Sequence, residues 1–221
     1  MSGEIKSFVR RQGRFTEAQK KAYDETGQRF LIPVSENYID LSSVYGNSND
    51  ITMEIGFGAG FATAEIAVAN PEKNYLGVEV HRPGIGRLLW EIEKRGLTNI
   101  RIIECDAAHV VKKMIPPASL SGIHIFFPDP WPKKRHHKRR LIQRPFTETL
   151  AGCLKKDSYL YMVTDWEDYA NHALEELSAT ANLQNKYQDF ALPQDWRPKT
   201  RFEAKGLAKA HIIRELMFKR K

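Results

Sequence analysis

From residue 51 onward, short apolar runs rich in β-branched residues alternate with runs of helical periodicity. Such alternation is typical of a doubly wound α/β domain, in which helices cover both faces of a mostly parallel sheet. The run 123–127 is apolar throughout, which predicts a central strand buried on both faces. We therefore predict a single domain over residues 31–221 with a seven-stranded sheet. The predicted strands are 51–55, 75–80, 100–105, 123–127, 159–163, 184–187 and 211–219, and the predicted helices are 61–68, 87–95, 140–154 and 169–179.

The first 30 residues lack this alternation. Residues 1–15 are polar and basic without clear periodicity, which predicts a flexible arm. Thr16 is a favourable helix N-cap, so a short helix is expected over 17–28. The arm also carries a weaker basic cluster, formed by Lys6, Arg10, Arg11 and Arg14.

Several classes of protein are excluded by composition. No apolar run has membrane-spanning length, and the start of the chain has no secretory signal pattern. We therefore expect a soluble, cytoplasmic protein with no membrane partner. Cys105 and Cys153 have no metal-binding spacing, so we expect two buried thiols and no metal site. The sequence implies no obligate protein partner, and we expect a monomer or a homodimer.

The positive charge of the chain is concentrated in one segment. The formal net charge is +7, and residues 133–144 contain seven Lys or Arg residues but no Asp or Glu. A generic solvated patch is the alternative, although such faces usually mix acids with bases. Phosphate binding requires a concentrated patch, because each neutralised phosphate releases condensed counterions. The cations are Lys133, Lys134, Arg135, Lys138, Arg139, Arg140 and Arg144.

A glycine-rich loop follows the first predicted strand. Residues 54–60 read Glu-Ile-Gly-Phe-Gly-Ala-Gly, and glycines allow a tight turn close to a ligand. In an open parallel sheet, such a turn lies where nucleotide-like ligands bind. Dinucleotide-binding loops have a third glycine at the position of Phe61 and hold a pyrophosphate, which Glu54 would repel. The loop with Gly56, Gly58 and Gly60 therefore favours S-adenosylmethionine, which carries an ammonium and a sulfonium, over NAD.

Two further acids lie at the ends of the next two predicted strands. Glu79 can accept hydrogen bonds from ribose hydroxyls, which both NAD and S-adenosylmethionine carry. Asp106 can accept a hydrogen bond from an adenine amino group. With Glu54 they form a constellation at three successive strand ends, and we expect all three to bind the cofactor. An ordinary turn with surface acids is the alternative.

A loop braced by prolines leaves the fourth predicted strand. Residues 128–132 read Pro-Asp-Pro-Trp-Pro, and these prolines stiffen the backbone around Asp129 and Trp131. Methyltransferases that modify base amines often carry a short Asn/Asp-Pro-Pro-aromatic loop at this place. The present loop has the same ingredients, so we expect Asp129 at the reacting base and Trp131 at a loop tip. A core position for Trp131 is the alternative.

The stretch that begins with this loop carries a family resemblance. Residues 128–140 read PDPWPKKRHHKRR, which resembles the PDPWPKKRHxKRR stretch of the bacterial tRNA (guanine-N7)-methyltransferase family, often called TrmB. Residues 164–166, residues 200–203 and Gly206 match further motifs of that family, so the resemblance covers residues 30–221. It implies a Rossmann-like class I methyltransferase fold, S-adenosylmethionine as cofactor, and tRNA as partner. The implied target is N7 of the guanosine at position 46, in the variable loop.

The resemblance also implies roles for individual residues. It makes Asp129 the catalytic residue and a cofactor contact, together with Glu54, Glu79 and Asp106 at the other strand ends. The implied substrate-binding residues are Lys133, Asp165, Thr200, Arg201, Phe202 and Glu203, and the implied RNA contacts are Arg135, His136, His137, Lys138, Arg139 and Arg140.

The chemistry of guanine N7 narrows the role of the acids. This atom already carries a free lone pair, so its methylation needs no general base. We interpret Asp129 and Asp165 as groups that orient the base and offset its developing positive charge. A-form RNA closes its major groove to side chains, so the target should lie in a loop. A methyltransferase for another base atom, a non-catalytic RNA-binding protein and a nicotinamide enzyme remain alternatives.

Overall fold

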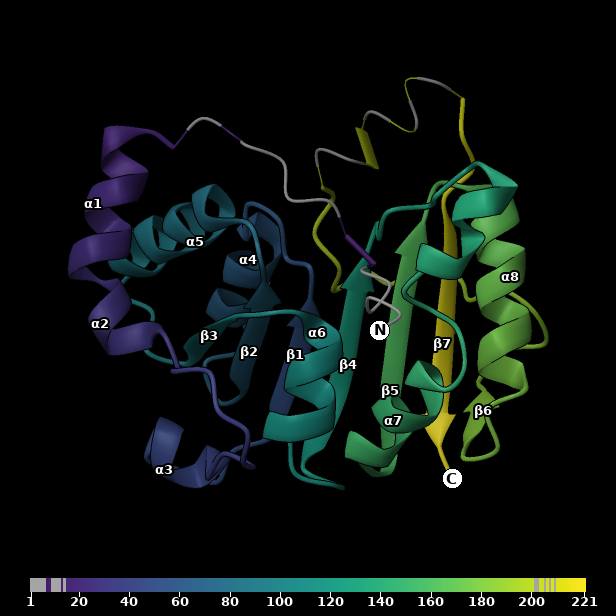
Figure 1. Ribbon diagram of the computed structural model, residues 1–221, viewed down its shortest axis with the longest axis horizontal. Helices are drawn as coiled ribbons and strands as arrows, with labels where there is room; N and C mark the ends of the chain where they lie inside the picture. Colours follow the sequence, from purple (N-terminus) through teal and green to yellow (C-terminus); the bar gives the residue numbers. More distant parts are fainter. Residues whose placement is uncertain are drawn as a thin grey trace, which may run out of the picture.

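The computed structural model of the chain describes residues 7–8, 13, 15–200, 203–204, 206, 208 and 210–221. Its centre is a seven-stranded sheet with the order β3-β2-β1-β4-β5-β7-β6 (Figure 1). The first five strands pair in parallel, and β7 is antiparallel to both β5 and β6. The predicted mostly parallel sheet is confirmed. The strands are β1 (Ile51–Ile55), β2 (Asn74–Glu79), β3 (Ile100–Glu104), β4 (Leu120–Phe126), β5 (Leu154–Thr164), β6 (Leu183–Asn185) and β7 (Arg214–Arg220).

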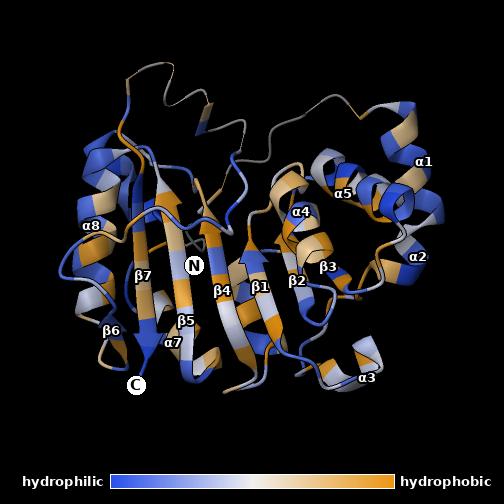
Figure 2. Ribbon diagram, turned by 180° about the vertical axis from the view of Figure 1, so that it is seen from behind, coloured by the Kyte–Doolittle hydropathy of each residue, from blue (hydrophilic) through white to orange (hydrophobic). Residues whose placement is uncertain are grey.

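Helices cover both faces of this sheet (Figures 1 and 2). One layer contains α4 and α5, with α1 and α2 packed outside them, and the opposite layer contains α6, α7 and α8. No helix in the described part of the chain is long and apolar enough to cross a membrane. The helices are α1 (Glu17–Glu25), α2 (Gly27–Phe30), α3 (Leu41–Tyr45), α4 (Phe61–Ala69), α5 (Arg82–Arg95), α6 (Ala107–His109), α7 (Phe146–Cys153) and α8 (Glu167–Ser178), with a π-helical turn at Val110–Met114 and a 3₁₀ helix at Lys134–Arg139.

Strand β4 lies at the centre of two apolar clusters, one on each face. Ile123 and Ile125 belong to one cluster, whereas Phe126 belongs to the other, as the alternation of side chains along a strand requires. His124 is also buried and faces the same side as Phe126, the side of α4 and α5, where its ring lies 5.3 Å from that of Phe126. The predicted central strand buried on both faces is therefore confirmed.

On the face of the sheet that carries α4 and α5, the strands β4, β5 and β7 are covered by a loop and not by a helix. Figure 2 shows this loop crossing β7, β5 and β4. The Trp196 ring on the loop stacks on His124, with 5.0 Å between ring centroids, and lies 5.1 Å from the ring of Tyr161. The loop is therefore attached to the sheet by aromatic contacts, in addition to the polar contacts described below.

The predicted helix over 140–154 is wrong in its first half. A 3₁₀ helix ends at Arg139, and α7 begins only at Phe146. Pro145 is the physical reason, because proline lacks the N–H that a helix interior needs and clashes with the preceding turn. Pro83 has the opposite effect: it fits the first turn of α5, which begins at Arg82 and not at residue 87. The short helix α3 was not predicted.

The N-terminal helix α1 begins as predicted. Thr16 caps it through a hydrogen bond from the Gln19 N–H, and Gln19 bonds back to the Thr16 N–H. Helix α1 then approaches α5 closely at Gly86. A Cβ atom on Gly86 would lie 2.5 Å from the Gln19 carbonyl oxygen and 2.8 Å from the Phe15 ring. The contact between the two helices therefore depends on the absence of a side chain at Gly86.

We expect Gly86→Ala to lower the free energy of unfolding by about 1–3 kcal/mol, because the backbone of α1 must move away. Urea denaturation measures this effect. Gly152→Ala in α7 is the matched control, since a Cβ there meets nothing within 4 Å. The control should be neutral or stabilising by up to about 1 kcal/mol. Equal losses in both variants would contradict the packing explanation.

Candidate active site

The carboxyl ends of β1 to β4 surround one cavity of about 410 Å³. The cavity lies between β1 and β4, where the direction of winding reverses, which is the usual ligand site of such sheets. Gly56 lines it after β1, Glu79 at the end of β2, Cys105 after β3 and Asp129 after β4. Its volume lies within the range of small-molecule sites, roughly 300–1,000 Å³.

The glycine loop forms the tight turn that its sequence predicts. Gly56, Gly58 and Gly60 have φ angles of +73°, +58° and +69°, a region that side chains rarely adopt. A Cβ on Gly56 or Gly58 would meet nothing within 4 Å, so these two glycines are needed for backbone conformation. A Cβ on Gly60 would lie 2.5 Å from the Cβ of Leu88, so Gly60 also allows the loop to pack on α5.

Glu79 holds the glycine loop from the neighbouring strand. Its carboxylate accepts hydrogen bonds from the backbone N–H groups of Gly58 (2.9 Å), Val80 (2.7 Å) and His81 (3.1 Å). A carboxylate has about four acceptor positions, so one remains for a hydroxyl in the cavity. Glu79 is therefore placed both to shape the loop and to face a ligand.

Glu54 occupies a different position from the one expected. Its side chain is only 4% exposed, accepts a 2.8 Å hydrogen bond from the Thr63 hydroxyl on α4, and does not line the cavity. Burial raises the pKa of Glu54 to about 7, and the negative charge of Glu79 acts in the same direction. Glu54 therefore lies behind the residues that line the cavity.

Asp106 lies at the rim of the cavity. Its carboxylate accepts a 2.9 Å hydrogen bond from the Ala108 N–H and so caps α6. The residues on either side of it, Cys105 and Ala107, line the cavity, whereas Asp106 itself does not. Cys105 is only half-buried, contrary to the expectation of two buried thiols. Burial raises the pKa of the Cys153 thiol to about 11, so that thiol is protonated at neutral pH.

The proline loop presents Asp129 to the cavity. Phe127 and Trp131 have φ angles of +50° and +48°, which are uncommon for residues with side chains. The Phe127 N–H donates a 2.8 Å hydrogen bond to the Val163 carbonyl of β5, which anchors the loop to the sheet. Two strained residues thus flank Asp129 and set its direction. Strain of this kind persists only where surrounding contacts over-determine the backbone.

Trp131 is neither a core residue nor a free loop tip. Its indole N–H donates a 3.0 Å hydrogen bond to the Ser7 carbonyl, and the Arg139 guanidinium lies 3.9 Å from the ring centroid. Arg139 also donates a 3.0 Å hydrogen bond to the Phe8 carbonyl. Ser7 and Phe8 line the cavity as well. Sequence reasoning did not assign them to the site, because they lie in a segment without periodicity.

The basic stretch forms an exposed surface beside Asp129. Lys133, Lys134, Arg135 and Lys138 are exposed, on or directly before the 3₁₀ helix, whereas His136 and His137 are half-buried. Desolvation and the surrounding cations lower the pKa of His136, so that its ring is neutral at pH 7. The concentrated positive charge predicted from the sequence is therefore exposed on the surface, where three lysines and Arg135 carry it.

Arg140 was expected to contact RNA, but the structure places it in the interior. Only 1% of its surface is exposed, and its guanidinium donates to the Pro130 carbonyl (3.1 Å) and to the Asp168 carboxylate on α8. Arg140 therefore braces the proline loop and is buried away from any phosphate. A run of basic residues does not indicate which of them turns inward, because the partner carboxylate is distant in the sequence. Arg144 is likewise paired, with Glu176.

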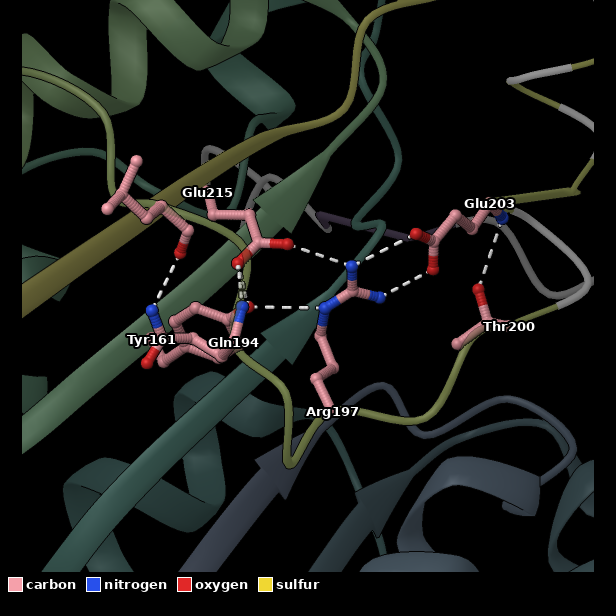
Figure 3. A network of polar contacts seen from close by, with 7 residues as sticks. Tyr161, Gln194, Arg197, Thr200, Glu203 and Glu215 are labelled. Atoms are coloured by element: carbon pink, nitrogen blue, oxygen red, sulfur yellow. Dashed lines mark hydrogen bonds and ion pairs between the residues drawn. The ribbon is translucent and has the colours of Figure 1, made fainter.

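The expected substrate residues are divided between two places. Asp165 follows β5 and lines a neighbouring hollow of about 520 Å³, where its Oδ2 lies 3.1 Å from the Nδ1 of His211. Glu203, expected to bind substrate, is buried and accepts two hydrogen bonds from Arg197 (Figure 3). Its carboxylate is therefore used inside the protein.

The remaining expected substrate residues are Lys133, which is exposed, Thr200, which is half-buried, and Arg201 and Phe202, which lie outside the described residues. The basic cluster of the N-terminal arm, Lys6, Arg10, Arg11 and Arg14, also lies outside the described residues.

Two contributors to the site were missed by sequence reasoning. Gly84 in α5 lets the helix approach the glycine loop, since a Cβ on it would lie 2.0 Å from the Gly58 carbonyl oxygen. Two glycines just before the helix predicted over 87–95, Gly84 and Gly86, were an available signal. Arg197 offered no comparable signal, because a single arginine in a polar segment is ordinary.

Solved structures with this architecture are methyltransferases. The 16S rRNA methyltransferase KamB matches with a TM-score of 0.63 and 12% identity, over 87% of this chain and 99% of that chain. The antibiotic-resistance methyltransferase Kmr matches with a TM-score of 0.58 and 13% identity, over 86% of this chain and 94% of that chain. At these identities the likeness concerns the fold alone. The chain thus has the Rossmann-like class I methyltransferase fold.

Sequence relatives narrow this class to one family. A family profile described as "Putative methyltransferase" matches residues 48–216. A tRNA (guanine-N(7)-)-methyltransferase of Nitrosomonas eutropha is 52% identical over 214 residues, 97% of this chain and 96% of its own. A protein of the same name from Burkholderia vietnamiensis is 50% identical over 217 residues, 98% of this chain and 85% of its own. The chain belongs to the tRNA (guanine-N(7)-)-methyltransferase family, and the resemblance seen at residues 128–140 is confirmed.

The raised pKa of Glu54 predicts pH-dependent binding of a cationic cofactor. A positive ligand interacts more favourably with the ionised carboxylate, whose fraction grows as pH rises through about 7. We expect the affinity for S-adenosylmethionine, measured by isothermal titration calorimetry, to rise between about pH 6 and about pH 8. The dependence should be weaker for S-adenosylhomocysteine, which lacks the sulfonium charge. An unchanged dependence in Glu54→Gln would assign the effect to another group.

Proposed function

We propose that the chain transfers a methyl group from S-adenosylmethionine to N7 of guanosine 46 in the variable loop of tRNA. The observation that carries the proposal is the position of Asp129, which lines one cavity with Gly56 and Glu79 and is followed directly by an exposed cationic surface. The name shared by the relatives supports the same reaction, since they are tRNA (guanine-N(7)-)-methyltransferases.

The residues around the cavity suit S-adenosylmethionine. When bound, this cofactor supplies an electrophilic methyl group on a sulfonium. Glu79 and Asp129 in the lining and Glu54 behind it give the cavity a negative potential, which attracts a cation and would repel a pyrophosphate. We assign Glu79 to the ribose hydroxyls and Asp106 to the adenine amino group. Gly56 and Gly58 present backbone with open space where a Cβ would stand.

Asp129 and Asp165 serve the guanine base in this proposal. Guanine N7 needs no proton removed, so the rate depends on holding the base in line with the methyl group. A carboxylate can accept hydrogen bonds from the N1–H and N2–H₂ edge and offset the positive charge that develops on the ring. The two acids come from the ends of neighbouring strands, β4 and β5, which places them on the same edge of the sheet.

The exposed basic surface is assigned to the phosphates of tRNA. Contacts of this kind position the RNA without reading its sequence. The variable loop meets the requirement for an accessible N7, because its bases are not enclosed in an A-form major groove. We further propose that the protein works in the cytoplasm as a monomer or homodimer.

Methyl transfer from labelled S-adenosylmethionine to unmodified tRNA tests the reaction. The modified nucleoside should be 7-methylguanosine, and mapping should place it at position 46. Label on adenine, or on a guanine atom other than N7, would refute the proposed function. A tRNA with adenosine at position 46 is the control substrate and should remain unlabelled.

Asp129→Asn tests the role of the carboxylate. The substitution keeps the shape of the side chain but removes its charge and one acceptor, so kcat should fall by about 100-fold. The affinity for tRNA should stay within about threefold, because the phosphate contacts lie on other residues. Single-turnover kinetics and filter binding measure the two quantities. A near-normal kcat with normal binding would remove Asp129 from the reacting centre.

The basic surface predicts a salt dependence of tRNA binding. Replacing Lys134 and Lys138 by alanine should weaken binding and reduce the slope of log K against log salt by about 1 to 2. Arg144→Ala is the matched control, because Arg144 is exposed but paired with Glu176. We expect the control to keep the wild-type slope. The same loss of slope in the control would show that the effect is one of net charge and not of this surface.

A further inference from the structure

A buried cluster of charged side chains lies under the loop that crosses β4 and β5 (Figure 3). At its centre the Arg197 side chain is 5% exposed and is bound between Glu203 and Glu215, which are 8% and 3% exposed. Arg197 donates to the two Glu203 oxygens at 2.6 and 3.1 Å and to Glu215 at 2.8 Å. Its Nε donates to the Tyr161 hydroxyl at 3.2 Å, and that hydroxyl donates in turn to Glu215. Four of the five N–H groups of the guanidinium are therefore used.

The partners of Arg197 belong to two different parts of the molecule. Tyr161 lies on β5 and Glu215 on β7, two paired strands in the rigid sheet. Glu203 lies outside the sheet, in the stretch 200–203 that the family resemblance assigns to substrate binding. The Thr200 hydroxyl accepts a 3.1 Å hydrogen bond from the Glu203 N–H, so Thr200 is held with it. The guanidinium is thus a cross-link between the sheet and this stretch.

The same segment returns to the site a few residues later. A Cβ on Gly206 would lie 2.9 Å from the Asp165 carboxylate, so the backbone at Gly206 lies directly against that side chain. The His211 ring then contacts Asp165 through its Nδ1 atom, and the backbone N–H of His211 donates a 3.0 Å hydrogen bond to the Gly206 carbonyl. The described residues of this segment are therefore held at two points, Glu203 at the Arg197 cluster, and Gly206 and His211 at Asp165.

We propose that Arg197 is a positioning residue, which through Glu203 sets the place of the 200–211 segment beside Asp165. This inference rests on the proposed function, because it assumes that the segment and Asp165 hold the guanosine. Two properties of the cluster support it. A bidentate arginine–carboxylate pair fixes orientation as well as distance, unlike a lysine contact. Buried ion pairs contribute little to net stability, so the fixed geometry of this pair explains its presence better than stability does.

Arg197→Lys is the informative substitution. Lysine keeps the positive charge between the two carboxylates, so that the fold is retained, but it loses the planar fork. We expect kcat for tRNA methylation to fall by about 10- to 100-fold, since a small misplacement of a bound group has effects of that size. The affinities for tRNA and for S-adenosylhomocysteine should stay within about threefold, because phosphate and cofactor contacts lie elsewhere. Glu203→Gln should show the same split to a smaller degree.

Hydrogen exchange provides a second measurement that does not depend on catalysis. The amides in residues 198–211, where Pro198 itself carries no amide hydrogen, should exchange faster in Arg197→Lys than in the wild type, while those of β1 to β5 stay unchanged. Arg95→Lys is the matched control: its guanidinium also lies between two carboxylates, at 2.9 Å from Glu91 and 2.5 Å from Glu65, but on helices α4 and α5. The control should keep kcat within about twofold and leave exchange in 198–211 unchanged.

Three results would overturn the inference. The first is a normal kcat in Arg197→Lys, whatever the exchange rates. The second is unchanged exchange in 198–211. The third is a fall in Tm with parallel losses of tRNA and S-adenosylhomocysteine binding, which would indicate a general structural role. If the wild type does not methylate guanine N7, the proposed function fails by itself, and the exchange measurement still decides whether Arg197 holds the segment.

Discussion

The parallel alignment of β1 to β4 is the constraint on which the site depends. Parallel strands end on the same edge of a sheet, so residues far apart in the chain meet there. The reversal of winding between β1 and β4 leaves a crevice at this edge, because the following segments diverge to opposite faces. Gly56, Glu79 and Asp129 reach one cavity for this reason alone. The arrangement of the strands creates the cavity, and the loops at the strand ends need only be short enough to leave it open.

Loops at this edge are fastened to the frame by buried arginines. Arg140 joins the proline loop to Asp168 at the start of α8, and Arg197 joins the 200–203 stretch to β5 and β7. A guanidinium suits this task because it offers several N–H donors in a fixed plane and can satisfy acceptors from separate elements at once. Burying such a charge is unfavourable unless every donor is paired, so each arginine imposes a defined geometry on its partners. The positive residues of the chain are thus divided between exposed positions and buried structural positions.

Local sequence patterns were sufficient to predict most of the strands and helices. Alternating apolar and helical runs predicted the strands to within a few residues, because burial on one or both faces dictates side-chain pattern directly. The glycine spacing at residues 54–60 predicted a tight turn, and the structure shows positive φ angles at its three glycines, a region that only glycine adopts readily. Where local patterns conflicted, the prediction was wrong. The helix over 140–154 ignored Pro145, whose ring excludes the residue from a helix interior.

What the sequence determined by itself was therefore the order of the elements, the turn at the glycines and the motif that identifies the family. All three depend on residues adjacent or nearly adjacent in the chain. The tertiary structure alone decided which charged residues face outward. Arg140 and Glu203 belong to motifs associated with RNA and substrate, yet both are buried, because Asp168 and Arg197 come within hydrogen-bonding distance only after folding. It also decided that Glu54 lies behind the cavity lining, where burial raises its pKa. Side-chain direction and burial follow from contacts between distant segments, and no local pattern encodes them.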